Sequence, residues 1–302
     1  MGWKGAGPVP GYASPAVRRR RLAAELRRLR DRAGLTEEQA AEHLGWSPAK
    51  VSRYELARTG LKTADVQKML DMYAVDGTHR EQLLALAREA TEKGWWEAYA
   101  DTLPADYVAF IGLEAEARSC LHWQAQVIPG LLQTKAYARQ ISTGQQKVDT
   151  ISPRQIDRRV AVRLIRQQLL TRDPPLELSV VLDESVLLRR LADNAVMHAQ
   201  LDRLVEASHL PNVTLRVLPL DGRHPIMTSS FTIFRFGDAD GAAEASLHDV
   251  VSNETLTSGE LHFEGDEATY QYGLAFASLA DAALSVSRSR ELISRTARRA
   301  WE

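Results

Sequence analysis

Residues 26–55 contain three short stretches of helix-forming sequence separated by tight turns, and this segment constrains the fold more than any other part of the chain. In the first helix, which begins before residue 26, Leu22, Leu26 and Leu29 recur on one helical face. Gly34 is expected to end this helix, because glycine readily adopts the left-handed conformation of a helix C-terminus. The spacing predicts a compact unit of short helices.

The second and third stretches begin at cap residues. Thr36, with Gln39 three residues later, is a capping-box pattern and predicts a helix that ends near Gly45. Ser47 can cap the third helix, and Pro48 suits its first turn because that position needs no amide hydrogen. Short helices at this spacing predict a helix-turn-helix, which lays its last helix in the major groove of DNA.

The third helix has an inward and an outward face. Val51 and Tyr54 lie three residues apart and are expected to pack inward. This leaves Ala49, Lys50 and Arg53 facing outward. Two cations and a small residue, on a helix that begins at a tight turn, favour contact with base edges and phosphates.

Residues from about 20 to 90 resemble the Cro/C1-type (Xre-family) helix-turn-helix domain of phage and bacterial repressors. The resemblance rests on RAGLT, the small Ala41 of the second helix, LGWS at the turn and VSRYE in the third helix. It implies a structural ion pair between Arg30 and Glu55. The family usually has a glutamine after the threonine cap, where it meets the DNA backbone. This chain has Glu37 there, which is expected to weaken or replace that contact because an acid repels phosphate.

The predicted DNA contacts come from the third helix, the start of the second and the first helix. Ser52 is expected to donate to a phosphate or to the packing of its own helix. The predicted DNA-binding residues are Ser47, Pro48, Ala49, Lys50, Ser52, Arg53, Thr36, Glu37 and Arg27. Two alternatives for this segment are a basic five-helix bundle and a domain of this fold that binds protein instead of DNA.

The charge distribution favours DNA binding by the N-terminal part. Residues 1–90 hold 16 Lys and Arg against 11 Asp and Glu, a net charge of +5, whereas residues 91–302 hold 22 against 28, a net charge of −6. The whole chain carries a net charge of only −1, so its positive charge is concentrated at one end.

A chain of 302 residues with 44% hydrophobic residues has enough material for two domains with separate cores. The predicted parts are a disordered arm over 1–15, a helix-turn-helix domain over 16–92, an aromatic-rich connector over 93–108 and a C-terminal α/β domain over 109–302. The chain has no run near the roughly 18 apolar residues of a membrane span, and its start lacks the apolar core of a signal peptide. A cytoplasmic protein without membrane contact is therefore expected.

The predicted fold class is α+β: an all-α domain of five helices followed by a mixed α/β domain with a small sheet covered by helices. The fourth helix is expected over 63–73 with Thr63 as its cap, and the fifth over 78–90. In the C-terminal domain, helices are expected over 112–123, over 152–171 and from Asp266 onward. Strands are expected over 177–184, 213–220, 230–237 and 248–255, and the first two, with the helix between them, form a β-α-β unit.

The C-terminal part also resembles a family. Its order of VIPGLLQT, a basic helix ending in LLTRDPP, then VLDESVL, PNVTLRVLP, SFTIFRF and NETLT is similar to the uncharacterised DUF5753-like domain that accompanies Xre-type domains in actinomycete regulators. The resemblance covers nearly all of residues 100–295. It implies a developmental or antibiotic-related transcription factor, often encoded beside a small partner protein. The segment DGRHPIMTSS is less glycine-rich than its counterpart in the family.

No motif in the sequence indicates catalysis. It contains no HExxH, GxSxG, GxxxxGK[ST] or GxGxxG pattern and no paired metal-ligand spacing of its histidines. Glu114 and Glu116 are two apart, which turns them away from each other on a helix, and Cys120 is expected to be a small core residue. His224 is expected to be structural. We therefore predict no catalytic residue, no metal site and no cofactor.

The C-terminal domain has three candidate roles: a small-molecule sensor, a protein-interaction module, and a dimerisation domain. The family resemblance places the interaction module slightly ahead. The expected partners are double-stranded DNA, a second copy of the chain in a homodimer, and a small protein partner or small-molecule effector. Cro/C1-type domains usually read two half-sites about 34 Å apart. The alternative function is an antitoxin-like module whose main activity is binding a small partner protein.

Overall fold

The computed structural model describes residues 15–57, 59–91, 95, 99, 103–144, 146, 150–236, 249–255, 259–264 and 266–302. By its contacts the chain divides into one unit of residues 1–97 with 237–247, and a second of residues 98–236 with 248–302. The predicted arm over 1–15 lies outside the described residues except for residue 15, and so does half of the predicted connector over 93–108. Each unit is described here by itself.

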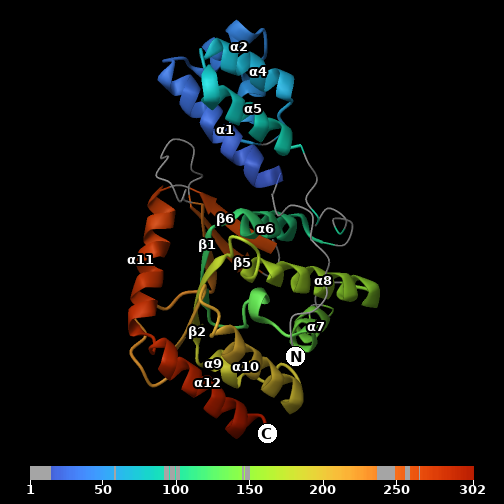
Figure 1. Cartoon of the computed structure of the whole chain (residues 1–302), viewed down its shortest axis with the longest axis vertical. Coiled ribbons are helices and arrows are strands. Elements are labelled where there is room, and N and C mark those ends of the chain that lie inside the picture. The colour runs from blue at the N-terminus through green and yellow to red at the C-terminus, as the bar shows by residue number, and fades with distance from the viewer. Residues whose placement is uncertain are drawn as a thin grey trace. The chain divides into compact units, whose positions relative to one another are not determined.

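The described residues of the first unit form five helices, as the sequence predicts. Figure 1 shows how these helices pack together. They pack around a core in which Leu22, Leu26, Val66, Met69 and Leu70 are fully buried. This core joins the first helix to the last two and includes Tyr54 of the third, while a smaller cluster of Ala40, Ala41 and Val51 packs the second helix against the third. The helices are α1 (Pro15–Arg32), α2 (Glu37–Leu44), α3 (Pro48–Glu55), α4 (Thr63–Met72) and α5 (Gly77–Glu89).

Local hydrogen bonds fix where the short helices begin and end. Thr36 accepts from the backbone of Gln39, whose side chain bonds back to Thr36, which confirms the capping box at the start of α2. Gly45 ends α2 with φ of 65°, the left-handed conformation that glycine tolerates. Ser47 stands at the cap position of α3 but makes no side-chain cap bond. The prediction that Thr63 caps α4 is wrong, because the helix begins with Thr63 and Lys62 takes the cap position.

The second unit is built on a six-stranded mixed sheet in the order β3-β2-β1-β4-β5-β6. Strands β1, β2 and β3 are parallel to one another, whereas β4, β5 and β6 add antiparallel pairs. The β-α-β prediction is confirmed, since β2 and β3 are parallel neighbours. The strands are β1 (Ser119–Gln124), β2 (Glu177–Asp183), β3 (Val213–Leu218), β4 (Phe231–Arg235), β5 (Val250–Thr255) and β6 (Gly259–Glu264).

Helices cover both faces of this sheet (Figure 1). On one face, Leu121 and Trp123 of β1 pack with Phe276 and Leu279 of α11. Alternate residues of β1, Cys120 and His122, point to the opposite face. The helices of this unit are α6 (Ala105–Glu116), α7 (Lys135–Gly144), α8 (Pro153–Arg166), α9 (Ser185–Leu188), α10 (Asn194–Ala207), α11 (Asp266–Ala282) and α12 (Val286–Ala300), with short 3-10 turns at Gly130–Leu132 and Gln167–Leu170.

Several elements of the second unit differ from the sequence-based expectation. Residues 119–123 were expected at the end of a helix over 112–123 but form the central strand β1, and β6 was not predicted. The four inner residues of β1 are all buried, so its apolar side chains do not alternate with polar ones, and a strand of this kind resembles a buried helix in sequence. The basic helix over 152–171 starts as predicted but ends as an α-helix at Arg166.

The predicted fold class, α+β with a five-helix N-terminal part, is confirmed. In the part of the chain that the structure describes, no helix is both long enough and apolar enough to cross a lipid bilayer.

Candidate nucleic-acid interface

Helix α3 is positioned by its own buried face. Val51 is fully buried and packs with Ala40 and Ala41 of α2. Trp46, in the turn between the helices, meets the ring of Tyr54 edge-on with 5.8 Å between ring centroids. Small residues on α2 allow the two helices to approach closely, and the aromatic pair fills the space beneath the turn. The opposite side of α3 is thereby presented to solvent.

The pair of Arg30 and Glu55 ties α1 to the end of α3. Arg30 Nε lies 2.8 Å from Glu55 Oε1 and Nη2 lies 2.8 Å from Oε2, so the contact is bidentate. Both side chains are buried, and Arg30 also donates to the backbone oxygen of Leu35 at 2.7 Å. The hydrogen bond to Glu55 raises the pKa of Arg30, so the guanidinium stays charged. The structure thus contains the pair that the family resemblance implies.

The solvent side of α3 is formed by its first turn and by Arg53. Ser47, Pro48, Ala49 and Arg53 are exposed, while Ser52 is half-buried. No ion pair joins Arg53 to another described residue. Its guanidinium is therefore available for a base edge or a phosphate.

Lys50 does not face outward as the helical pattern predicts, and that expectation is wrong. Its ammonium nitrogen lies 2.9 Å from Asp65 Oδ2 of α4 and 3.6 Å from the centroid of the Trp46 ring. Only 29% of its side chain is exposed. The flexible four-carbon stem explains the difference, because it lets the charged end fold back across the aromatic ring to a carboxylate.

The remaining predicted contacts lie on α1 and at the start of α2. Thr36 uses its hydroxyl oxygen to cap α2, and Glu37 is the first residue of that helix and half-buried. These two residues lie at the far end of α2 from the tight turn that joins α2 to α3. Arg27 is exposed on α1, a separate helix.

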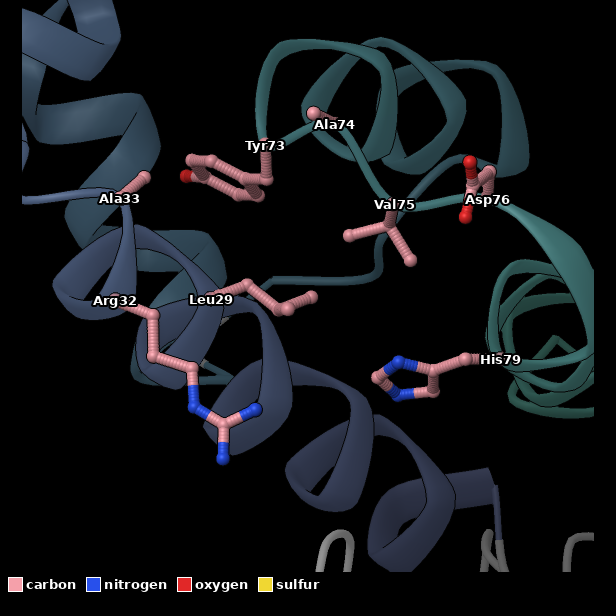
Figure 2. Close-up of a pocket in the computed structure, with 8 residues that line it drawn as sticks. All are labelled: Leu29, Arg32, Ala33, Tyr73, Ala74, Val75, Asp76 and His79. Atoms are coloured by element: carbon pink, nitrogen blue, oxygen red, sulfur yellow. The ribbon is translucent and has the colours of Figure 1, made fainter.

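A hollow of about 380 Å³ in the first unit lies away from α2 and α3 (Figure 2). Leu29 of α1 and Val75 in the turn between α4 and α5 face each other across it, with His79 of α5 at one side. The complete set of lining residues is Leu29, Arg32, Ala33, Tyr73, Ala74, Val75, Asp76 and His79. Because none of them belongs to α2 or α3, the hollow is not part of the candidate interface.

The second unit contains a buried ion pair that the sequence did not predict. Arg166 of α8 binds Glu114 of α6 through two bonds of 2.6 Å and 2.7 Å, and both side chains are almost fully buried. Their neighbour Cys120 is completely buried, and burial raises the pKa of its thiol well above the ordinary value. A neutral, enclosed thiol is a core group. The carboxylate of Glu114 is neutralised by the guanidinium 52 residues further along the chain.

Asp65 and Trp46 are the residues of the interface that sequence reasoning missed. Asp65 lies in the first turn of α4, ten residues after the end of α3, and nothing in the local pattern connects it to Lys50. The only signal in the sequence is a tryptophan directly before the cap residue of a basic helix, a position from which an aromatic ring can cover a cation.

Two helices joined by a tight turn, with the second held by α1 and its polar side exposed, define a helix-turn-helix protein. Residues 21–83 match the family described as a helix-turn-helix domain, which suggests DNA binding. Residues 107–295 match the family described as a domain of unknown function, DUF5753, and the chain belongs to this family. No curated protein and no solved structure is similar enough to this chain to count as a match.

Proposed function

We propose that this protein is a sequence-specific DNA-binding regulator of transcription that inserts α3 into the major groove. The observation that carries the proposal is the exposed guanidinium of Arg53 beside the small, exposed Ala49 on a helix fixed from behind by the Arg30–Glu55 pair. Arginine is the commonest side chain in specific contacts with guanine, and a small neighbour lets the helix approach the base edges closely. A rigid helix holds that geometry at low entropic cost.

We assign the exposed residues of α3 and α1 to different parts of the DNA. Arg53 reads a base edge, and the exposed first turn of α3, with Ser47 and Ala49, approaches the adjacent backbone. Arg27 of α1 steadies a phosphate. One small domain with few base contacts binds weakly, so a homodimer on a pseudo-palindromic operator is part of the proposal.

The DUF5753 domain is proposed to control DNA binding through a small protein partner or a small-molecule effector. The support is its separate core, because residues of the sheet and of α11 form an apolar cluster of their own. A domain that folds around its own core is able to carry a regulatory site independent of the DNA-reading helix. The proposed location is the cytoplasm, with the protein on the nucleoid when bound to DNA.

The test is the replacement of Arg53 by alanine in the full-length chain. A duplex is first selected from a random library with the wild-type protein, and binding to it and to single-base variants is then measured. If Arg53 is bidentate to guanine, Arg53→Ala weakens binding by about 1–3 kcal/mol and relaxes specificity at one position. Arg88→Ala on α5 is the control, since it removes another exposed arginine from a different helix. Equal binding by the Arg53 variant and the wild type would contradict the proposal.

One observation favours a second function, a module that binds a small partner protein. The acidic Glu37 stands where a phosphate contact is usual, and Lys50 is neutralised by Asp65, so the face around α3 is less positive than its sequence indicates. Selection that yields no DNA motif, together with a stoichiometric small protein that co-purifies with the chain and is lost with Arg53→Ala, would support this alternative.

A further inference from the structure

Asp65 is the centre of a cluster behind the exposed face of α3. The same carboxylate oxygen, Oδ2, receives Lys50 Nζ at 2.9 Å and the hydroxyl of Tyr54 at 2.7 Å. Lys50 lies in addition over the ring of Trp46. These four residues, Lys50, Asp65, Trp46 and Tyr54, are called the Lys50 latch below.

The chemistry of the Lys50 latch keeps its charges paired near neutral pH. Burial by itself would raise the pKa of Asp65, but the hydrogen bonds from Tyr54 and Lys50 outweigh burial and lower it. Burial, followed by the bond to Asp65, raises the pKa of Tyr54 to about 12, so the phenol remains a donor. Asp65 also lies in the first turn of α4, where the helix dipole favours a negative charge.

We propose that Asp65 is a positioning residue that holds Lys50 out of the DNA contact. The inference rests on the proposed function, because it assigns a role within the same DNA-binding face. Lys50 and Arg53 are the two cations of α3, and among the described residues only Lys50 contacts a carboxylate and an aromatic ring. DNA is therefore contacted by Arg53, while the attraction that Lys50 would add is cancelled by Asp65.

Because Asp65 holds Lys50, the protein has a lower affinity for DNA of any sequence. A lysine contacts phosphate as a point charge, and phosphate contacts carry no sequence information. Release of Lys50 adds one phosphate contact, which steepens the dependence of log K on log salt by about 0.9 and strengthens binding roughly tenfold near 0.1 M salt. The Lys50 latch thus limits non-specific binding to DNA and leaves the base contact of Arg53 unchanged.

The experiment compares four full-length proteins: the wild type, Asp65→Asn, Lys50→Met and the double variant. Each is titrated with the duplex selected by the wild type and with a mixed-sequence duplex, from about 50 to 200 mM salt. Asp65→Asn is expected to bind both duplexes roughly tenfold more tightly at the middle of that range, with the steeper salt dependence. The double variant has the net charge of the wild type and lacks the Lys50 latch, and it is expected to bind as the wild type does.

A charge-matched control separates release of Lys50 from a general change of charge. Asp71→Asn alters the net charge by the same amount on the same helix, but Asp71 pairs with Arg80 at 2.6 Å and not with Lys50. This variant is expected to keep the salt dependence of the wild type. Thermal unfolding of each variant without DNA shows that it is folded.

Three outcomes would overturn the proposal. If the double variant binds DNA much more weakly than the wild type, Lys50 already contacts DNA in the wild type. If Asp65→Asn gains no affinity for DNA, Asp65 does not keep Lys50 from DNA. A gain on the selected duplex alone would place Lys50 on a base and not on a phosphate. In each case the proposed function stands as long as Arg53→Ala weakens binding. If neither the wild type nor any variant binds a duplex, both proposals are overturned.

The contact is also measurable without DNA. The carboxyl pKa of Asp65, followed by NMR in the full-length chain with labelled aspartate, is expected to rise in Lys50→Met because one of its hydrogen-bond donors is removed. An unchanged pKa would show that the Lys50 latch does not form, whatever the chain does with DNA.

Discussion

At the scale of single residues, the surroundings of a charged side chain decide whether it is available to DNA or makes a structural contact. Lys50 and Arg53 carry the same charge three positions apart on α3. Lys50 contacts Asp65 and Trp46, whereas Arg53 is exposed. The Arg30–Glu55 pair shows the same dependence, because its charges are buried together and make a structural contact only.

His122 of β1 is a residue whose burial has a consequence for the dependence of stability on pH. Burial, with the nearby charge of Arg166, lowers its pKa from 6.5 to about 3, and its Nδ1 lies 3.0 Å from the hydroxyl of Thr232. Between these two pH values the unfolded chain binds a proton that the folded chain does not. The stabilising contribution is therefore complete above pH 6.5 and is lost as the pH falls towards 3.

We expect the free energy of unfolding of the second unit to fall by about 1.4 kcal/mol per pH unit below the ordinary histidine pKa on account of this residue. His122→Gln, which keeps a hydrogen-bonding side chain beside Thr232 but does not titrate, should remove that part of the slope. Urea unfolding from pH 6.5 down to about 5 measures the difference. Parallel curves for the two proteins would mean that His122 is protonated in the folded state.

At the scale of helices and strands, boundaries follow from bonds within a few residues. Helix α2 has a complete capping box and a left-handed glycine at its end, and both were readable from the sequence. Helix α3 starts with proline and a serine that makes no cap bond. Its position therefore depends on packing against α2 and on the Arg30–Glu55 pair.

This contrast predicts different costs for two similar substitutions. Thr36→Ala removes the side-chain bond to the Gln39 backbone and should lower the free energy of unfolding of the first unit by about 1 kcal/mol. Ser47→Ala removes no cap bond and should stay within about 0.5 kcal/mol of the wild type. Urea denaturation, followed by circular dichroism, compares the two variants. Equal losses would show that Ser47 caps α3 in solution.

At the scale of the whole molecule, the chain has two apolar cores, and its N-terminal and C-terminal parts carry net charges of opposite sign. The first core contains Leu26 and the second Leu279, each fully buried. The net charge of +5 in residues 1–90, against −6 in residues 91–302, places the positive charge in the part of the sequence that contains α3, and this favours attraction of that part to DNA.

Separate cores predict separate unfolding. Leu26→Ala should destabilise the first unit and Leu279→Ala the second, each by about 2–5 kcal/mol, because each leaves a cavity in its own core. Scanning calorimetry of the full-length protein is expected to show two transitions, with each substitution lowering only one of them. A shift of both transitions by either substitution would show that the units unfold as one.

The sequence by itself determined the features whose causes are local. Helical spacing, the capping box at Thr36 and the glycine at the end of α2 depend on bonds within about four residues, so the five helices and their order were predictable. The Arg30–Glu55 pair was reachable only through the family resemblance. The β-α-β unit was predictable because its strands are separated by a clear helix.

Only the tertiary structure decided the rest. Residues 119–124 form a strand because β2 and β4 lie on either side of them, and a fully buried segment carries no alternating pattern that would reveal this. Glu114 meets Arg166 across 52 positions, and Lys50 meets Asp65 across a turn and a helix boundary. Such contacts depend on which elements become neighbours in space, and this is settled by the packing of the whole unit and not by any short stretch of sequence.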